Sequence, residues 1–215
     1  MKALIVVDVQ NDFVQGGALA VREGDRVVPV ANALIPQFEL VVATQDWHPA
    51  EHGSFAANHP GKKVGDVIEL GGLRQYLWPV HCVQNTRGAE LVAGLRRERI
   101  DHIVKKAIDP AIDSYSAFFD NGHLRATGLQ EYLQSRGVDE IYIAGLATDY
   151  CVKFTALDGL ELGYRVNVVE DGCRGVNVKP GDSQTAIEEV RRAGARIVRS
   201  DQVLSDAAAP RRGAS

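Results

Sequence analysis

The chain has 215 residues, of which 45% are hydrophobic and 24% charged, and this composition predicts one soluble globular domain with a full-sized core. The net charge of −4 provides no basic surface, so we expect no nucleic acid and no membrane as a partner. The apolar run at the start is too short for a signal peptide, and three scattered cysteines form no disulfide framework, which is typical of a cytoplasmic protein. We expect one domain over residues 1–205 and a flexible tail over residues 206–215.

Short apolar runs alternate with amphipathic runs along most of the chain. The apolar runs predict strands at residues 3–7, 40–43, 102–105, 141–144, 166–169 and 196–198. Helical spacing of apolar residues predicts helices over residues 27–38 (ended early by Pro36), 89–99, 124–136, 150–162 and 183–193. No regular element is predicted within residues 49–88. This alternation indicates an α/β fold, a three-layer, doubly wound, six-stranded parallel sheet covered on both faces.

Reactive side chains stand where the predicted strands end. Asp8 ends the first strand, Asp46 and His48 follow the second, Lys106 ends the third and Cys151 follows the fourth. Because the carboxyl ends of parallel strands meet at one edge of the sheet, where ligands bind, we expect these side chains to lie together. The placement favours an enzyme.

Cys151 is the candidate nucleophile. It falls in the first turn of the helix that follows the strand at 141–144, where the helix dipole favours a thiolate and N–H groups could hold an oxyanion. Thr148 or Asp149 could cap this helix. The alternative is a small buried cysteine near a helix start.

A thiol nucleophile needs a base or a nearby charge. Asp8 is the candidate proton acceptor and Lys106 the candidate electrostatic support. Lys105 competes with Lys106, because adjacent residues on a strand face opposite ways and only one of the two can point inward.

A metal site is the second candidate feature. Asp46 and His48 are two residues apart in extended chain, so their side chains face the same way. A carboxylate with two imidazoles and open positions suits Zn²⁺, Fe²⁺ or Mn²⁺. The alternative is a polar loop with hydrogen-bonded histidines. Three more histidines follow in the long irregular segment: His52, His59 and His81.

Aromatic residues lie on the loops that leave the same strand ends. They could wall a pocket for a flat apolar ring, or they could simply anchor the loops to the core. These residues are Phe13, Trp47, Trp78, Tyr115 and Phe118.

Five motifs occur along the chain: DVQNDF at 8–13, QDWHP at 45–49, WPVHC at 78–82, DSYSAF at 113–118 and ATDYCV at 147–152. Together they resemble, in the same order, the motifs of bacterial nicotinamidases, which belong to the isochorismatase-like cysteine hydrolases. The resemblance covers residues 1 to about 200. The cysteine motif indicates only the superfamily, whereas D-x-H with the later W-P-x-H-C indicates nicotinamidases within it.

The resemblance implies roles for matched residues. Lys106 matches the family lysine because it lies four residues before Pro110. His52 matches a metal ligand of some relatives only, so its role stays open. The family also has a cis peptide before the alanine that matches Ala147. The implied sets are the triad Asp8, Lys106 and Cys151, the metal ligands Asp46, His48 and His81, the ring-binding Phe13, Trp78 and Tyr115, and an oxyanion hole from the N–H groups of Ala147 and Cys151.

The implied activity is hydrolysis of nicotinamide to nicotinate and ammonia through a cysteine thioester, in NAD salvage, with pyrazinamide as a second substrate. One divalent metal is implied, zinc before iron or manganese. The alternatives are a related amidohydrolase for ureido or carbamoyl substrates, which would not need the metal, and a metal-binding or ring-binding protein without turnover. Assembly into a homo-oligomer stays open.

Overall fold

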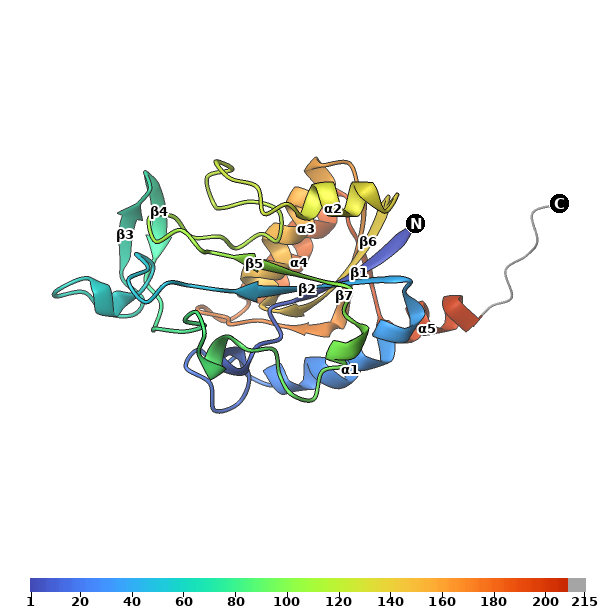
Figure 1. The fold of residues 1–215 in the computed structure, drawn as a ribbon, viewed down its shortest axis with the longest axis horizontal. Coiled ribbons are helices and arrows are strands. Elements are labelled where there is room, and N and C mark those ends of the chain that lie inside the picture. The colour runs from blue at the N-terminus through green and yellow to red at the C-terminus, as the bar shows by residue number, and fades with distance from the viewer. Residues whose placement is uncertain (209–215) are drawn as a thin grey trace.

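A computed structural model describes residues 1–208 and shows a single six-stranded sheet at the centre of the molecule (Figure 1). All its neighbouring strands pair in parallel, in the order β5-β2-β1-β6-β7-β8, which confirms the predicted doubly wound sheet. The strands are β1 (Lys2–Val7), β2 (Leu40–Asp46), β5 (His102–Lys106), β6 (Glu140–Leu146), β7 (Arg165–Arg174) and β8 (Arg196–Val198).

Helices cover both faces of the sheet, as the three-layer prediction requires (Figure 1). In β1, Ala3, Ile5 and Val7 belong to one apolar cluster and Leu4 and Val6 to the other, which explains why the strand is apolar without alternation. One face carries α2 (Leu129–Ser135), α3 (Lys153–Glu161) and α4 (Asp182–Ala193), and the other carries α1 (Val27–Leu34) and α5 (Ser200–Ala208).

An antiparallel hairpin, β3 (Val67–Leu70) with β4 (Leu73–Tyr76), stands apart from the central sheet (Figure 1). It lies in the segment where no element was predicted. Gly71 and Gly72 join its strands and both have positive φ, 59° and 77°. A Gly-Gly pair is a two-residue hairpin signal, so the turn could have been found from the sequence.

The helix predicted over residues 89–99 is wrong. The segment contains only two short 3-10 turns, Arg87–Ala89 and Arg97–Arg99. Ala89, Leu91 and Leu95 lie in the core, but the backbone pairs with a distant part of the chain: the Val92 N–H donates to the Val9 carbonyl at 2.9 Å. Helical spacing of buried residues does not by itself distinguish a helix from such a packed loop.

Other elements also differ from prediction, among them the start of α2 and the presence of α5. The helix predicted from residue 124 begins at Leu129, because the Thr127 N–H instead donates to the Phe118 carbonyl and Gly128 adopts a left-handed conformation (φ 89°). Helix α5 was not predicted; it runs to Ala208, so residues 206–208 of the expected tail are helical and the rest of that tail lies outside the described residues. Within residues 1–208 no helix is long and apolar enough to span a bilayer.

Candidate active site

Four neighbouring strands each deliver one reactive side chain to the same edge of the sheet. Lys106 is the last residue of β5 and Asp46 the last of β2, while Asp8 follows β1. Cys151 lies after β6 in a single π-helical turn, Thr148–Val152, that leads into α3. The predicted convergence is therefore what the sheet order β5-β2-β1-β6 produces.

Lys106 is the centre of this group. Its ammonium is fully buried, 3.4 Å from the Cys151 sulfur and 3.0 Å from Oδ2 of Asp8. It also forms an ion pair with Asp46 and donates to the Ser114 carbonyl at 2.9 Å. These contacts bring together the three residues predicted as the triad.

Lys105 points the other way. It is exposed, and its ammonium lies 3.6 Å from the ring centroid of Trp47. The two lysines face opposite ways, as strand alternation requires, and burial shows that Lys106 is the one that points inward, as the position of Pro110 had indicated.

Asp8 has the properties of a base. Burial raises its pKa to about 6, even though Lys106 lowers it. Its Oδ1 accepts a hydrogen bond from the Thr44 hydroxyl at 2.5 Å, which fixes the carboxyl group. Its Oδ2 is buried and accepts no hydrogen bond of normal geometry within residues 1–208, and a carboxylate oxygen of Asp8 lies within 4.8 Å of the Cys151 sulfur.

Burial raises the pKa of the Cys151 thiol well above its usual value, and the nearby carboxylates of Asp8 and Asp46 add to this while Lys106 opposes it. The expected effect of the helix dipole is thus outweighed, and the sulfur rests as a thiol. Burial alone would lower the pKa of Lys106, but Asp46 and Asp8 outweigh it, so the pKa is raised and the amine stays charged. Attack by Cys151 therefore requires a base.

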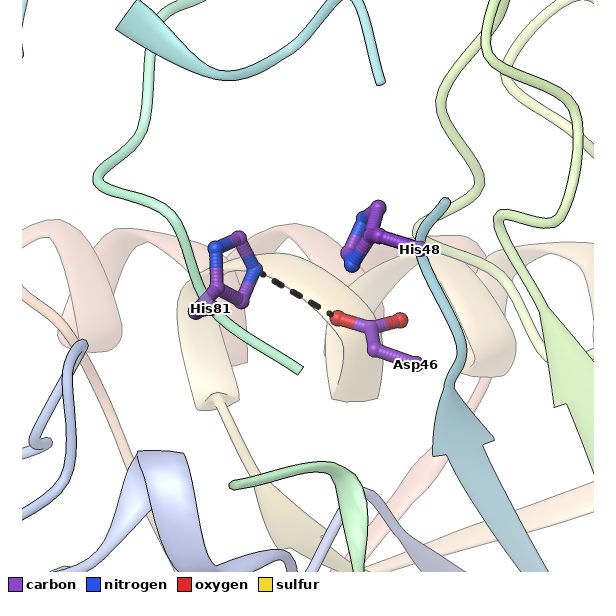
Figure 2. A group of neighbouring side chains, drawn as sticks. All are labelled: Asp46, His48 and His81. Atoms are coloured by element: carbon purple, nitrogen blue, oxygen red, sulfur yellow. Dashed lines mark ion pairs between the residues drawn. The ribbon is translucent and has the colours of Figure 1, made fainter. Parts of the chain in front are cut away.

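A second cluster, drawn in Figure 2, shares Asp46 with the first. Asp46, His48 and His81 are all buried, and their ligand atoms lie within 4.8 Å of one another. Nε2 of His81 is 3.8 Å from Oδ2 of Asp46. Nδ1 of His81 is 2.8 Å from the Pro79 carbonyl, which can only accept, so Nδ1 carries the hydrogen and the lone pair of Nε2 faces the cluster.

The residues present fit a divalent cation. Both ring nitrogens of His48 are buried and have no hydrogen-bond partner in the described part of the chain. Asp8 and Asp46 share one buried ammonium, that of Lys106, and a third buried carboxylate, Asp113, lies 3.5 Å from His48, so these carboxylates outnumber the lysine by two charges. Buried charges need partners, and a divalent cation would balance these two.

The other histidines of the segment lie outside the Asp46 cluster. His52 groups with His48 and Asp113 instead, and its Nδ1 is 2.8 Å from the Ser54 hydroxyl. His59 is 2.7 Å from the Gly53 carbonyl. His59 therefore lies apart from the predicted ligands, whereas His52 lies next to one of them, His48, and its role stays open.

Gln10 holds Asp46 in place, and this role was not predicted. The buried Gln10 amide donates to the Asp46 carbonyl at 2.8 Å, and its oxygen accepts the Asp46 N–H at 2.9 Å. No local signal in the sequence marked this role, because Gln10 is simply a polar residue three positions after the end of β1.

A pocket lined by residues of both clusters opens beside Cys151. The predicted Phe13, Trp78 and Tyr115 line it, whereas Phe118 is buried in the core and Trp47 lies under Lys105. Sequence reasoning missed several lining residues because they come from unrelated loops. The full lining is Phe13, Leu19, Asp46, His48, Trp78, His81, Asp113, Tyr115, Ala147, Tyr150, Cys151 and Val176.

The turn that carries Cys151 has a cis peptide between Leu146 and Ala147, as the resemblance implied. The prediction that Thr148 or Asp149 caps the helix is wrong, because neither side chain makes a capping hydrogen bond. The Asp149 carboxylate instead accepts the N–H groups of Val176 (2.8 Å) and Asn177 (2.7 Å), and so fixes the loop that carries Val176 into the pocket.

Comparison with known proteins agrees with this geometry. The isochorismatase domain model matches residues 2–202. A nicotinamidase from Escherichia coli is 54% identical over 200 residues, which cover 91% of this chain and 93% of the relative.

Two solved structures are also similar. The yeast nicotinamidase bound to the inhibitor nicotinaldehyde has a TM-score of 0.88 and 35% identity, covering 93% of this chain and all of that chain. The pyrazinamidase of Pyrococcus horikoshii in complex with zinc has a TM-score of 0.74 and 42% identity, covering 92% of this chain and 98% of that chain. The chain therefore belongs to the isochorismatase family and, within it, to the nicotinamidases.

Proposed function

We propose that this protein hydrolyses nicotinamide to nicotinate and ammonia, and pyrazinamide in the same way, as the names of its relatives indicate. The observation that carries the proposal is the contact of the Cys151 sulfur with the buried Lys106 ammonium at 3.4 Å, beside Asp8, at the floor of an aromatic pocket. The product nicotinate feeds NAD salvage.

Asp46, His48 and His81 would hold one divalent metal, and zinc is favoured because a relative was solved with it. When bound, the metal would supply a Lewis acid that anchors the ring nitrogen of the substrate. His81 is already oriented for this by the Pro79 carbonyl.

The chain's own side chains carry out the acyl transfer. Asp8 accepts the Cys151 proton while the sulfur forms a bond to the carboxamide carbon, and the carbonyl electrons move to oxygen. The N–H groups of Ala147 and Cys151, with the Lys106 charge, stabilise that oxyanion. The C–N bond then breaks while Asp8 returns the proton to nitrogen. Ammonia departs, and the acyl group remains bound to Cys151 as a thioester.

Hydrolysis of the thioester uses the same groups. Asp8 takes a proton from water, the hydroxide attacks the acyl carbon, and the C–S bond breaks to release nicotinic acid, which loses its proton to solvent and becomes nicotinate. The thiolate of Cys151 recovers the proton from Asp8. Phe13, Trp78 and Tyr115 would hold the flat ring during both steps.

Metal removal tests the proposed function directly. Ammonia release from nicotinamide is expected to fall at least about tenfold after treatment with a chelator and to return when Zn²⁺ is added, because the ring loses its anchor. Calorimetric titration with nicotinate should lose affinity in parallel. An amidohydrolase for ureido substrates would release no ammonia from nicotinamide and would be indifferent to the chelator, and a binding protein without turnover would release none at all.

The pH dependence follows from Asp8, which must be ionised to accept the Cys151 proton. Its folded pKa is raised to about 6, so kcat/KM should rise as pH increases through about 6 and then level off. A bound cation would move this limb to lower pH, because positive charge favours the carboxylate. Measurement of kcat/KM between pH 4 and pH 8 checks it, and an acid limb centred above pH 7 would contradict Asp8 as the base.

A further inference from the structure

The buried Gln75 side chain contacts both Tyr115, in the aromatic wall of the pocket, and Asp113, which lies next to His48. Gln75 lies on β4 of the outlying hairpin and is only 3% exposed. Its amide nitrogen is 3.1 Å from the Tyr115 hydroxyl, 3.1 Å from Oδ2 of Asp113 and 2.7 Å from the Tyr76 carbonyl. A carbonyl and a carboxylate can only accept, so the amide must present its nitrogen to them.

The two groups that Gln75 joins both line the pocket. Oδ1 of Asp113 lies 3.5 Å from Nε2 of His48, and Tyr115 stands in the aromatic wall. The Tyr115 oxygen also accepts the indole N–H of Trp78 at 3.2 Å. The two N–H groups of Gln75 are shared among the Tyr76 carbonyl, Asp113 and the Tyr115 oxygen. The indole N–H of Trp78 and a shared amide N–H therefore together hold the Tyr115 hydroxyl in place.

We infer that Gln75 is a positioning residue for substrate binding, which ties the Tyr115 ring wall to Asp113 and thereby to the His48 side of the pocket. This inference rests on the proposed function for the identity of the ring. It also gives the β3–β4 hairpin a role, because Gln75 lies on β4 of this hairpin and not on the central sheet.

The first test is the variant Gln75→Leu, which removes both amide N–H donors while changing the side-chain volume little. We expect KM for nicotinamide to rise about five- to tenfold with kcat within about twofold, because the lost interaction supports the bound ring in both ground and transition states. Arg74→Ala, an exposed neighbour on the same strand, is the control and should leave both constants unchanged. An unchanged KM in folded Gln75→Leu would overturn the inference.

Gln75→Glu separates hydrogen bonding from packing. Glutamate keeps the size of glutamine but places an acceptor against the Asp113 carboxylate and the Tyr76 carbonyl. It should therefore raise KM more than Gln75→Leu does. The reverse order would mean that only volume matters, and the inference would fail.

A double-mutant cycle with Tyr115→Phe tests the specific link. If Gln75 acts through the Tyr115 hydroxyl, KM of the double variant should be no higher than KM of the more impaired single variant. A KM increase equal to the product of the two single increases would overturn the link. The fluorescence emission maximum of Trp78, measured without substrate in a Trp47→Phe background, reports on the same hydrogen bonds. Tyr115→Phe and Gln75→Leu should shift this maximum to a similar extent, and Arg74→Ala should not shift it. This readout stands even if the wild-type enzyme releases no ammonia, so failure of the proposed function is distinguishable from failure of the inference.

Discussion

Replacement of Cys151 by alanine is expected to abolish ammonia release from nicotinamide. The thiol is the only proposed covalent partner of the acyl group, so its loss should lower kcat by about 10³-fold or more. The Asp46, His48 and His81 cluster is untouched, and the variant should keep the bound metal and the affinity for nicotinate. Ammonia assays, metal analysis and calorimetry measure the three quantities.

Cys173→Ala provides the matched control for this variant. Cys173 is also buried, and burial raises its pKa to about 12, but it lies in β7 and does not line the pocket. Its replacement should leave turnover close to wild type. Residual activity above about 1% in Cys151→Ala would rule out this nucleophile, since loss of a covalent path costs orders of magnitude.

The strand ends were predictable because two simple patterns coincide there. A strand buried on both faces reads as a continuous apolar run, and the polar residues that follow it mark the carboxyl edge of the sheet. This placed Asp8, Asp46 and Cys151 correctly without any long-range information. Strand alternation alone left Lys105 and Lys106 open, and the structure decides between them by burial.

What the sequence could not supply were the contacts between distant loops. Gln10 and Gln75 act through hydrogen bonds to residues 36 and 40 positions away, and nothing local distinguishes them from solvent-facing glutamines. Asp149 had the local signature of a helix cap, yet its carboxylate serves a loop 27 residues later. The segment at 89–99 had helical spacing because its buried residues pack against α1 while its backbone pairs elsewhere.

Lys106→Met should show the second large effect, on both activity and folding. Methionine has nearly the same length but no charge, so Asp8 and Asp46 would lose their shared buried ammonium. Removal of one partner of a buried ion pair costs about 3–5 kcal/mol of unfolding free energy, and loss of the charge beside the oxyanion should lower kcat by about 10³-fold. The free energy of unfolding is measured with urea and turnover with the ammonia assay.

Lys105→Met is the matched control, because it removes a lysine charge at an exposed position instead of the buried one. It is the same substitution one residue earlier on the same strand, but the Lys105 ammonium lies over Trp47 at the surface, where a charge contributes little. We expect unfolding free energy within about 0.5 kcal/mol of wild type and turnover within about twofold. If the two variants behaved alike, or if Lys106→Met kept more than about a tenth of wild-type kcat, Lys106 would not act on the reacting groups. Metal analysis of Lys106→Met completes the test, because unchanged metal content assigns the lost turnover to the ammonium beside Cys151 rather than to a disturbed Asp46.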